Sequence, residues 1–188
     1  NSGGPDGDTG TAETIAFADG PGAAFEGGGT ITLGGSQLTL EQSVAIDGDL
    51  DGDGTPDITL DAAGQSRVID LAGGTATLNG LRIVNGDVPD AVSIFEAAGG
   101  GIRVDRGASL DLSASTVAGN SADRGGGIYN RFDTATLTDV TLSGNSARFG
   151  GGLYTFYGTV TLTNSTVVGN STVMGNSADR GGGIGHLS

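Results

Sequence analysis

The sequence predicts an all-β protein, a parallel β-helix (β-solenoid) of about six coils with roughly 25 residues in each coil. A Gly-Asn-Ser triplet recurs at intervals of 25 residues, beginning at Gly119, Gly144 and Gly169. Between the triplets lie short runs of alternating apolar and polar residues rich in Val, Ile and Thr, which favours strands over helices. A chain that repeats strands and turns with a fixed period of this length is typical of stacked coils.

The apolar runs of successive repeats are expected to lie above one another. Coils stacked about 4.8 Å apart pair each strand with its counterpart in the next coil and bury columns of Val, Leu and Ile. We predict three inward columns: Ile102, Ile128, Leu153 and Ile184; Leu110, Leu137 and Leu162; and Val117, Leu142 and Val167. The asparagines of the triplets, Asn120, Asn145 and Asn170, are predicted to form a hydrogen-bonded ladder.

The first half of the chain is less regular but has the same ingredients. Apolar runs separated by Gly or Asp occur at residues 31–33, 38–40, 44–46, 58–60, 68–71, 75–78 and 81–84. We expect residues 1–10 to be a flexible N-terminus and residues 11–188 to be a single β-helix domain. Terminal repeats normally carry a polar cap. None is visible after Gly183, so we expect either a fragment of a longer solenoid or self-association through the open end.

The composition excludes several classes of function. The chain has 188 residues with 38 glycines, no cysteine and one histidine, so it has neither disulfides nor a cysteine or multi-histidine metal site. Eight arginines and no lysine stand against 22 acids, and the net charge of −14 would repel nucleic acid. The missing lysine also excludes a P-loop and Schiff-base chemistry. No apolar stretch approaches the ~18 residues of a transmembrane segment.

Residues 47–61, DGDLDGDGTPDITLD, carry six acids and have the spacing of a calcium-binding loop. Asp49, Asp51 and Asp53 occupy positions 1, 3 and 5 of a D-x-D-x-D-G-x-x-D pattern, and Asp57 occupies position 9. Alternating carboxylates can converge on one hard cation, and the carbonyl oxygen of Thr55 at position 7 would be the backbone ligand. We therefore predict a calcium site formed by Asp49, Asp51, Asp53, Thr55 and Asp57.

This loop departs from the helix–loop–helix calcium pattern. Position 12 is Leu60 in place of a bidentate glutamate, and the flanking runs are expected to be strands. The loop is similar to the compact calcium loops of thrombospondin type 3 repeats and integrin-type FG-GAP blades. This resemblance implies a stabilising ion rather than a regulatory one. The alternative is an acidic, solvated turn that binds no ion.

Aromatic side chains gather just after the glycine turns of consecutive repeats. They are Tyr129, Phe132, Tyr154, Phe156 and Tyr157. On a flat β-face they could stack on sugar rings or dock a partner, and they could equally pack beneath their own loop. Two further columns, one of Asp123, Arg148 and Asp179 and one of Arg124, Phe149 and Arg180, are expected to form structural ion pairs and cation–π contacts.

The repeats resemble a known class of bacterial surface protein. The segments GNSADRGGGIYN (119–130), GNSARFGGGLY (144–154) and GNSADRGGGI (175–184) are similar to the GNSA…GGAI repeats of polymorphic outer membrane proteins and related autotransporter passengers. The likeness covers most of residues 14–184, with GGGI in place of GGAI. It implies a right-handed parallel β-helix exported to the surface of a bacterium, where it acts in adhesion or as a structural layer.

Two functions follow from these observations. The first is a non-enzymatic extracellular or cell-surface β-helix, adhesin-like or structural, with calcium in the loop and a cell-surface glycan or protein as a partner. The second is a polysaccharide-active β-helix such as a calcium-dependent polyuronate lyase, in which an outward-facing Arg82 or Arg103 would remove the α-proton. General acid–base catalysis needs a tuned pair of groups in a cleft, and His186 has no identifiable Ser or Asp partner. We therefore expect no enzyme activity and no catalytic residue.

Overall fold

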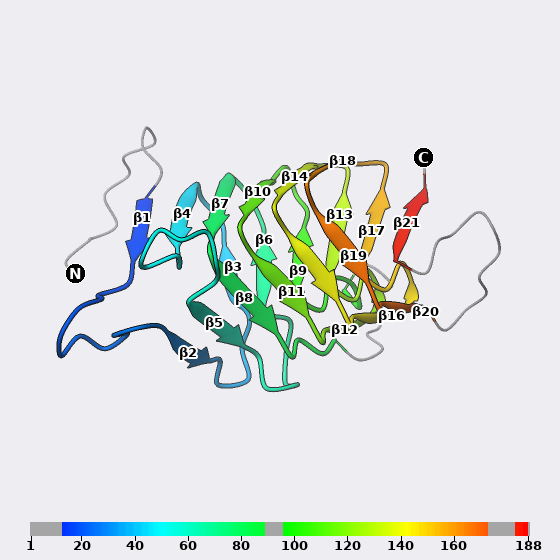
Figure 1. The fold of residues 1–188 in the computed structure, drawn as a ribbon. Coiled ribbons are helices and arrows are strands. Elements are labelled where there is room, and N and C mark those ends of the chain that lie inside the picture. Colours follow the sequence, from blue (N-terminus) through cyan, green and yellow to red (C-terminus); the bar gives the residue numbers. More distant parts are fainter. Residues whose placement is uncertain (1–12, 89–95, 173–182, 188) are drawn as a thin grey trace.

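The chain forms a parallel β-helix of six coils (Figure 1). The computed structural model describes residues 13–88, 96–172 and 183–187. Three six-stranded sheets run along the axis, a shorter fourth sheet joins the last three coils, and no helix occurs among these residues. The predicted fold class is confirmed.

Each coil contributes one strand to each long sheet. Sheet A consists of β1 (Glu13–Ala16), β4 (Val44–Asp47), β7 (Thr75–Asn79), β10 (Ser109–Ser113), β14 (Thr134–Thr138) and β18 (Thr159–Thr163). Sheet B consists of β2 (Gly29–Thr32), β5 (Ile58–Asp61), β8 (Leu81–Val84), β11 (Thr116–Ala118), β15 (Thr141–Ser143) and β19 (Thr166–Val168). Sheet C consists of β3 (Leu38–Leu40), β6 (Ile69–Leu71), β9 (Ile102–Val104), β13 (Ile128–Arg131), β17 (Leu153–Phe156) and β21 (Ile184–Leu187).

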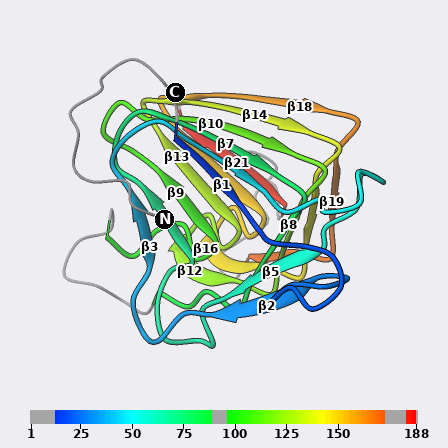
Figure 2. The ribbon, with the colours of Figure 1, turned by 90° about the vertical axis from the view of Figure 1, so that its left-hand side faces the viewer.

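The three long sheets, which Figure 2 shows in a view along the axis, enclose one apolar core. On sheets A and B every second residue points inward, so β7 alternates between exposed and buried positions. Sheet C differs, because β6 and β9 are buried at every position. Its outer face is therefore covered by other parts of the chain, and this face holds the buried polar groups described below.

The coils are not equally long. Hydrogen bonds between adjacent coils join residues 32 positions apart at Asn79 and Asp47, and 34 apart at Leu81 and Ser115, but 25 apart at Asn120 and Asn145. The predicted spacing of 25 residues holds between the paired strands from β10 to β19, whereas most earlier spacings are longer, Ile58 and Leu81 are 23 apart, and Leu153 and Ile184 are 31 apart. The earlier coils are longer because loops on the outside, such as residues 48–57, extend without disturbing the strand stack.

Two of the three predicted inward columns are confirmed. Ile102, Ile128, Leu153 and Ile184 pair in register, as do Val117, Leu142 and Val167. The predicted column of Leu110, Leu137 and Leu162 was wrong at Leu110. Leu137 pairs with Leu112 and Leu162, whereas Leu110 pairs with Ala76 and Ala135. Both leucines of β10 face the core. A shift of two residues keeps the inward face apolar, so the alternation alone does not fix the register.

The asparagine ladder is confirmed, and the glycine clusters pack against it. Nδ2 of Asn120 donates a hydrogen bond to Oδ1 of Asn145 at 3.0 Å, and Nδ2 of Asn145 donates to Oδ1 of Asn170 at 2.9 Å. Gly125 opens its cluster with a φ of 57°. A Cβ atom on the next residue, Gly126, would overlap the carbonyl oxygen of Ser146 in the following coil. The glycines therefore allow both the turn and the close approach of adjacent coils.

The last three coils contain a fourth strand that the repeat pattern did not predict. Sheet D consists of β12 (Ser121–Arg124), β16 (Ser146–Phe149) and β20 (Ser171–Thr172). The Ser-Ala-Asp-Arg sequence of β12 has low intrinsic strand propensity, so pairing with the next coil accounts for its conformation. This pairing places the Arg124 guanidinium 4.9 Å from the centroid of the Phe149 ring, which confirms the predicted cation–π contact.

Some predictions lie outside the described residues. These are the flexible segment at residues 1–10 and the stacking partners Asp179 and Arg180. In the part of the chain that the structure describes, no helix has the length and apolar character needed to cross a membrane.

Candidate functional site

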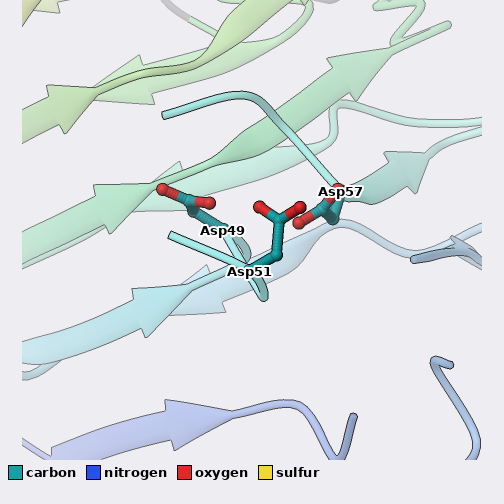
Figure 3. Close-up of side chains that lie close together, drawn as sticks. All are labelled: Asp49, Asp51 and Asp57. Carbon is teal, nitrogen blue, oxygen red and sulfur yellow. The ribbon is translucent and has the colours of Figure 1, made fainter. Parts of the chain in front are cut away.

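The acidic loop connects β4 of sheet A to β5 of sheet B, and three of its carboxylates converge (Figure 3). One side-chain oxygen each from Asp49, Asp51 and Asp57 lies within 4.8 Å of the other two. The loop bends at Gly52 and Gly54, whose φ values of 74° and 80° favour glycine. Three carboxylates at this separation are the oxygen ligands that a hard cation such as Ca²⁺ prefers.

Backbone amides of the loop hold all three of these carboxylates in place. The amide of Asp53 donates a hydrogen bond to Oδ1 of Asp51 at 3.1 Å. Gly52 and Gly54 donate amide hydrogen bonds to Oδ1 and Oδ2 of Asp49, at 2.9 and 3.0 Å. The amide of Leu50 donates to Oδ2 of Asp57 at 2.7 Å. Each of these acceptor oxygens keeps a further lone pair, so the same carboxylates can accept the amides and still contact a cation.

The fourth predicted carboxylate, Asp53, lies outside this cluster. Its Oδ1 accepts hydrogen bonds from the amide and the hydroxyl of Thr55, at 2.8 and 2.6 Å. These bonds favour the charged form and hold the pKa of this fully exposed carboxyl below its usual value. The structure therefore brings together Asp49, Asp51 and Asp57, whereas Asp53 and Thr55 contact each other.

The loop is also anchored to the coils on both sides of it. The carbonyl oxygen of Asp57 accepts a hydrogen bond from the amide of Gly29 in the preceding coil, at 3.0 Å. On the other side, Gly80 of the following coil lies so close that an added Cβ would overlap the backbone of Asp49. A change in the geometry of the loop would therefore alter the packing of three successive coils.

The predicted aromatic site divides into a buried pair and an exposed cluster. Tyr129 and Tyr154 are 0% and 3% exposed and stack with ring centroids 6.0 Å apart, packed against Ala98. These two residues therefore pack inside the protein and are not available to a ligand. Burial raises the pKa of Tyr129 to about 12, and its hydroxyl has no hydrogen-bond partner among the described residues.

The other three aromatic residues form a cluster at the turn between sheets C and A. Phe132 and Tyr157 are 60% and 55% exposed, and their rings stack with centroids 5.7 Å apart. Phe156 packs edge-on against both rings, at 5.6 Å from Phe132 and 4.8 Å from Tyr157. Phe132 and Tyr157 both have positive φ, which is uncommon for bulky side chains. This cluster is the part of the predicted aromatic site that remains accessible.

A buried polar network on the outer face of sheet C was not anticipated. Arg103 forms an ion pair with Asp70, with Nε and Nη2 donating to the two carboxylate oxygens at 2.6 and 2.7 Å. Nη1 of Arg67 donates to Oε1 of Gln37 at 2.6 Å, and its Nε and Nη2 donate to the backbone carbonyl oxygens of residues 96, 98 and 99. Burial, followed by the nearby charge of Arg103, lowers the pKa of Arg67 to about 10.

This network changes the interpretation of the two arginines proposed as a catalytic base. Arg103 does point outward from sheet C, between the core residues Ile102 and Val104, but it is only 7% exposed and is paired with Asp70, so it is not an accessible base. The covering segments around residues 37 and 97 account for its low exposure. Arg82 lies at an exposed position of β8, as expected. One signal was present in the sequence: aligning Ile69 with Ile102 places Asp70 beside Arg103 in adjacent coils.

Comparisons with protein-family models, with curated proteins and with solved structures found no match to this chain.

Proposed function

We propose that this protein is a non-enzymatic β-helix of the extracellular space or bacterial cell surface, adhesin-like or structural, whose N-terminal coils are stabilised by calcium. One observation carries the calcium part of the proposal. The side-chain oxygens of Asp49, Asp51 and Asp57 lie within 4.8 Å of one another on a loop that contacts the coils on both sides. A cation bound there would fix the conformation of a loop that packs against both adjacent coils.

The charge distribution supports a stabilising cation in this part of the molecule. Residues 1–66 contain twelve acids and no arginine, whereas all eight arginines follow. Like charges at close range repel, and a divalent cation removes this repulsion among the carboxylates that contact it. The weaker class of calcium site needs free calcium at about 0.1–1 mM, a concentration typical of the extracellular space.

Thermal unfolding with and without calcium tests the proposal. We expect 1 mM calcium to raise the unfolding midpoint relative to EDTA, because a ligand at about one to ten times its Kd adds roughly 0.4–1.4 kcal/mol to the free energy of unfolding. Magnesium should have a smaller effect, since it demands stricter octahedral geometry.

The double variant Asp49→Asn/Asp51→Asn removes two of the three clustered carboxylates. We expect its midpoint to be the same in calcium and in EDTA, because one carboxylate of the cluster is too few to hold the ion. The matched control is Asp111→Asn, an exposed aspartate of β10 outside the loop, which should keep the calcium response. Equal midpoints of the unmodified protein in calcium and EDTA would refute the calcium site.

The alternative function, a polyuronate lyase, requires an accessible base. Arg82 is the remaining candidate, at an exposed position of sheet B. Incubation with pectin or alginate in calcium, followed by ultraviolet absorbance, tests it. Steady formation of unsaturated product that disappears in Arg82→Ala would replace the non-enzymatic proposal.

Two kinds of partner follow from the proposal. A cell-surface glycan or protein would contact the exposed cluster of Phe132, Phe156 and Tyr157. A second copy would stack on the last described coil, where Ile184, which continues a column of core residues, is 41% exposed. Glycan-array binding that is lost in Phe132→Ala/Tyr157→Ala supports the first partner. A molecular mass in light scattering that increases with concentration supports the second.

A further inference from the structure

The outer face of sheet A presents a regular array of short hydroxyl side chains from β7 to β18. Each of these four strands turns three side chains outward: Thr75, Thr77 and Asn79; Ser109, Asp111 and Ser113; Thr134, Thr136 and Thr138; and Thr159, Thr161 and Thr163. We call this surface the threonine face. The residues between them, such as Leu78 and Leu137, are fully buried and fix the sheet to the core.

The array is periodic in two directions. Along the helix axis the pairing is in register, so Thr134, Thr136 and Thr138 lie directly beside Thr159, Thr161 and Thr163. Parallel strands lie about 4.8 Å apart, and alternate residues along a strand lie about 6.6 Å apart. The four strands run side by side along one edge of the coil, as Figure 2 shows. Because threonine is β-branched, its χ1 is restricted, which fixes the methyl and hydroxyl groups relative to this grid.

The hydroxyl groups of the face are available to solvent. Among the described residues, no threonine hydroxyl of the face makes a hydrogen bond to protein, although Oγ of Ser113 bonds to Oδ1 of Asn79 at one edge. Asp111 is the one charged residue of the face, in a protein whose net charge is −14. No aromatic side chain belongs to it. The face is therefore rigid, hydroxylated and nearly uncharged.

We propose that the threonine face binds the surface of ice crystals. A threonine hydroxyl both donates and accepts, so each can take the place of one water molecule in an ordered layer. The adjacent methyl groups favour ordered water around them, because apolar surface restricts the orientation of its first hydration shell. The two repeat distances of the grid are close to those between oxygen atoms on prism faces of ice. Crystalline polysaccharides are less well matched, because flat aromatic rings are what stack on sugars.

Thermal hysteresis and ice recrystallisation assays test this proposal, with the full chain in calcium-containing buffer. We expect the unmodified protein to separate the freezing point from the melting point, to shape ice crystals and to slow recrystallisation. The double variant Thr136→Lys/Thr161→Lys places two long charged side chains in the centre column and should lose all three effects. Asp111→Thr, which completes that column, should strengthen them.

The matched control places the same substitutions on another face of the same coils. Thr116→Lys/Thr141→Lys changes two outward residues of sheet B and should retain the ice activity. Circular dichroism confirms that each variant is folded. An unmodified protein without hysteresis or recrystallisation inhibition overturns the proposal, as does equal loss in the control pair. Retention by crystalline chitin or cellulose without any effect on ice would reassign the face to polysaccharide. The calcium proposal is tested by different residues and is unaffected by either result.

Discussion

The buried ion pair between Asp70 and Arg103 should be the most sensitive point of the N-terminal half of the β-helix. The two side chains are 4% and 9% exposed, and the carboxylate accepts two hydrogen bonds from Arg103 and one from Gln37. Asp70→Ala removes the charge that faces a buried guanidinium, while the second buried guanidinium, that of Arg67, remains nearby. Removing one partner of a buried pair costs about 3–5 kcal/mol.

This cost is large relative to the whole stability of a domain, which is about 5–15 kcal/mol. Urea unfolding followed by circular dichroism, in calcium, should therefore show a much lower midpoint for Asp70→Ala. The control is Asp111→Ala, whose exposed carboxylate contacts solvent, and a surface change of this kind stays within about 0.5 kcal/mol. Because coils interact mainly with their neighbours, hydrogen exchange should increase first in β6 and β9.

A double variant separates the role of charge from that of packing. Asp70→Leu/Arg103→Met replaces the pair with apolar side chains, and such replacements are often neutral or stabilising. We expect it to regain most of the stability lost in Asp70→Ala. A loss below about 1 kcal/mol in Asp70→Ala, or a double variant less stable than the single one, would refute this reasoning.

Three further predictions concern the repeats. Gly126→Ala should cost at least about 2 kcal/mol in urea unfolding, because its Cβ would overlap the backbone of the next coil, whereas Gly34→Ala meets open space and should be nearly neutral. Asn145→Ala should lower the free energy of unfolding by about 3 kcal/mol, since it removes several buried hydrogen bonds. Asn170 is half-buried, so Asn170→Ala should cost less. Equal losses in the two variants would contradict the prediction that the buried asparagine of the ladder contributes more. Tyr129→Phe should be neutral or stabilising by up to about 1 kcal/mol in the same assay. Burial raises the pKa of Tyr129 from 10.0 to about 12, so the unfolded chain ionises before the folded one and the free energy of unfolding should fall as pH rises from 10 toward 12, a fall that Tyr129→Phe should lack. Ultraviolet absorbance reports the ionisation of tyrosine as the pH is raised. The step at the highest pH should be present in the unmodified protein and absent in Tyr129→Phe.

The sequence by itself determined the architecture, because the evidence for it is periodic. A triplet every 25 residues defines the coil, alternating side chains define which residues face inward, and Asn145 could be placed above Asn120 by counting. The acidic loop could also be predicted, because the pattern of its aspartates lies within one short segment of the chain. The length of the earlier coils could not, because loops outside the strand stack leave no periodic signal.

Only the tertiary structure decided the register and the state of the outer faces. The alternation in β10 fits the core in two positions, and the pairing of the whole strand selected Leu112 rather than Leu110 as the neighbour of Leu137. Tyr129 and Arg103 occupy outer positions of sheet C and are nevertheless buried, whereas Phe132 is exposed. The physical reason is that an inward position follows from the strand itself, but the burial of an outward one depends on distant segments that fold across it.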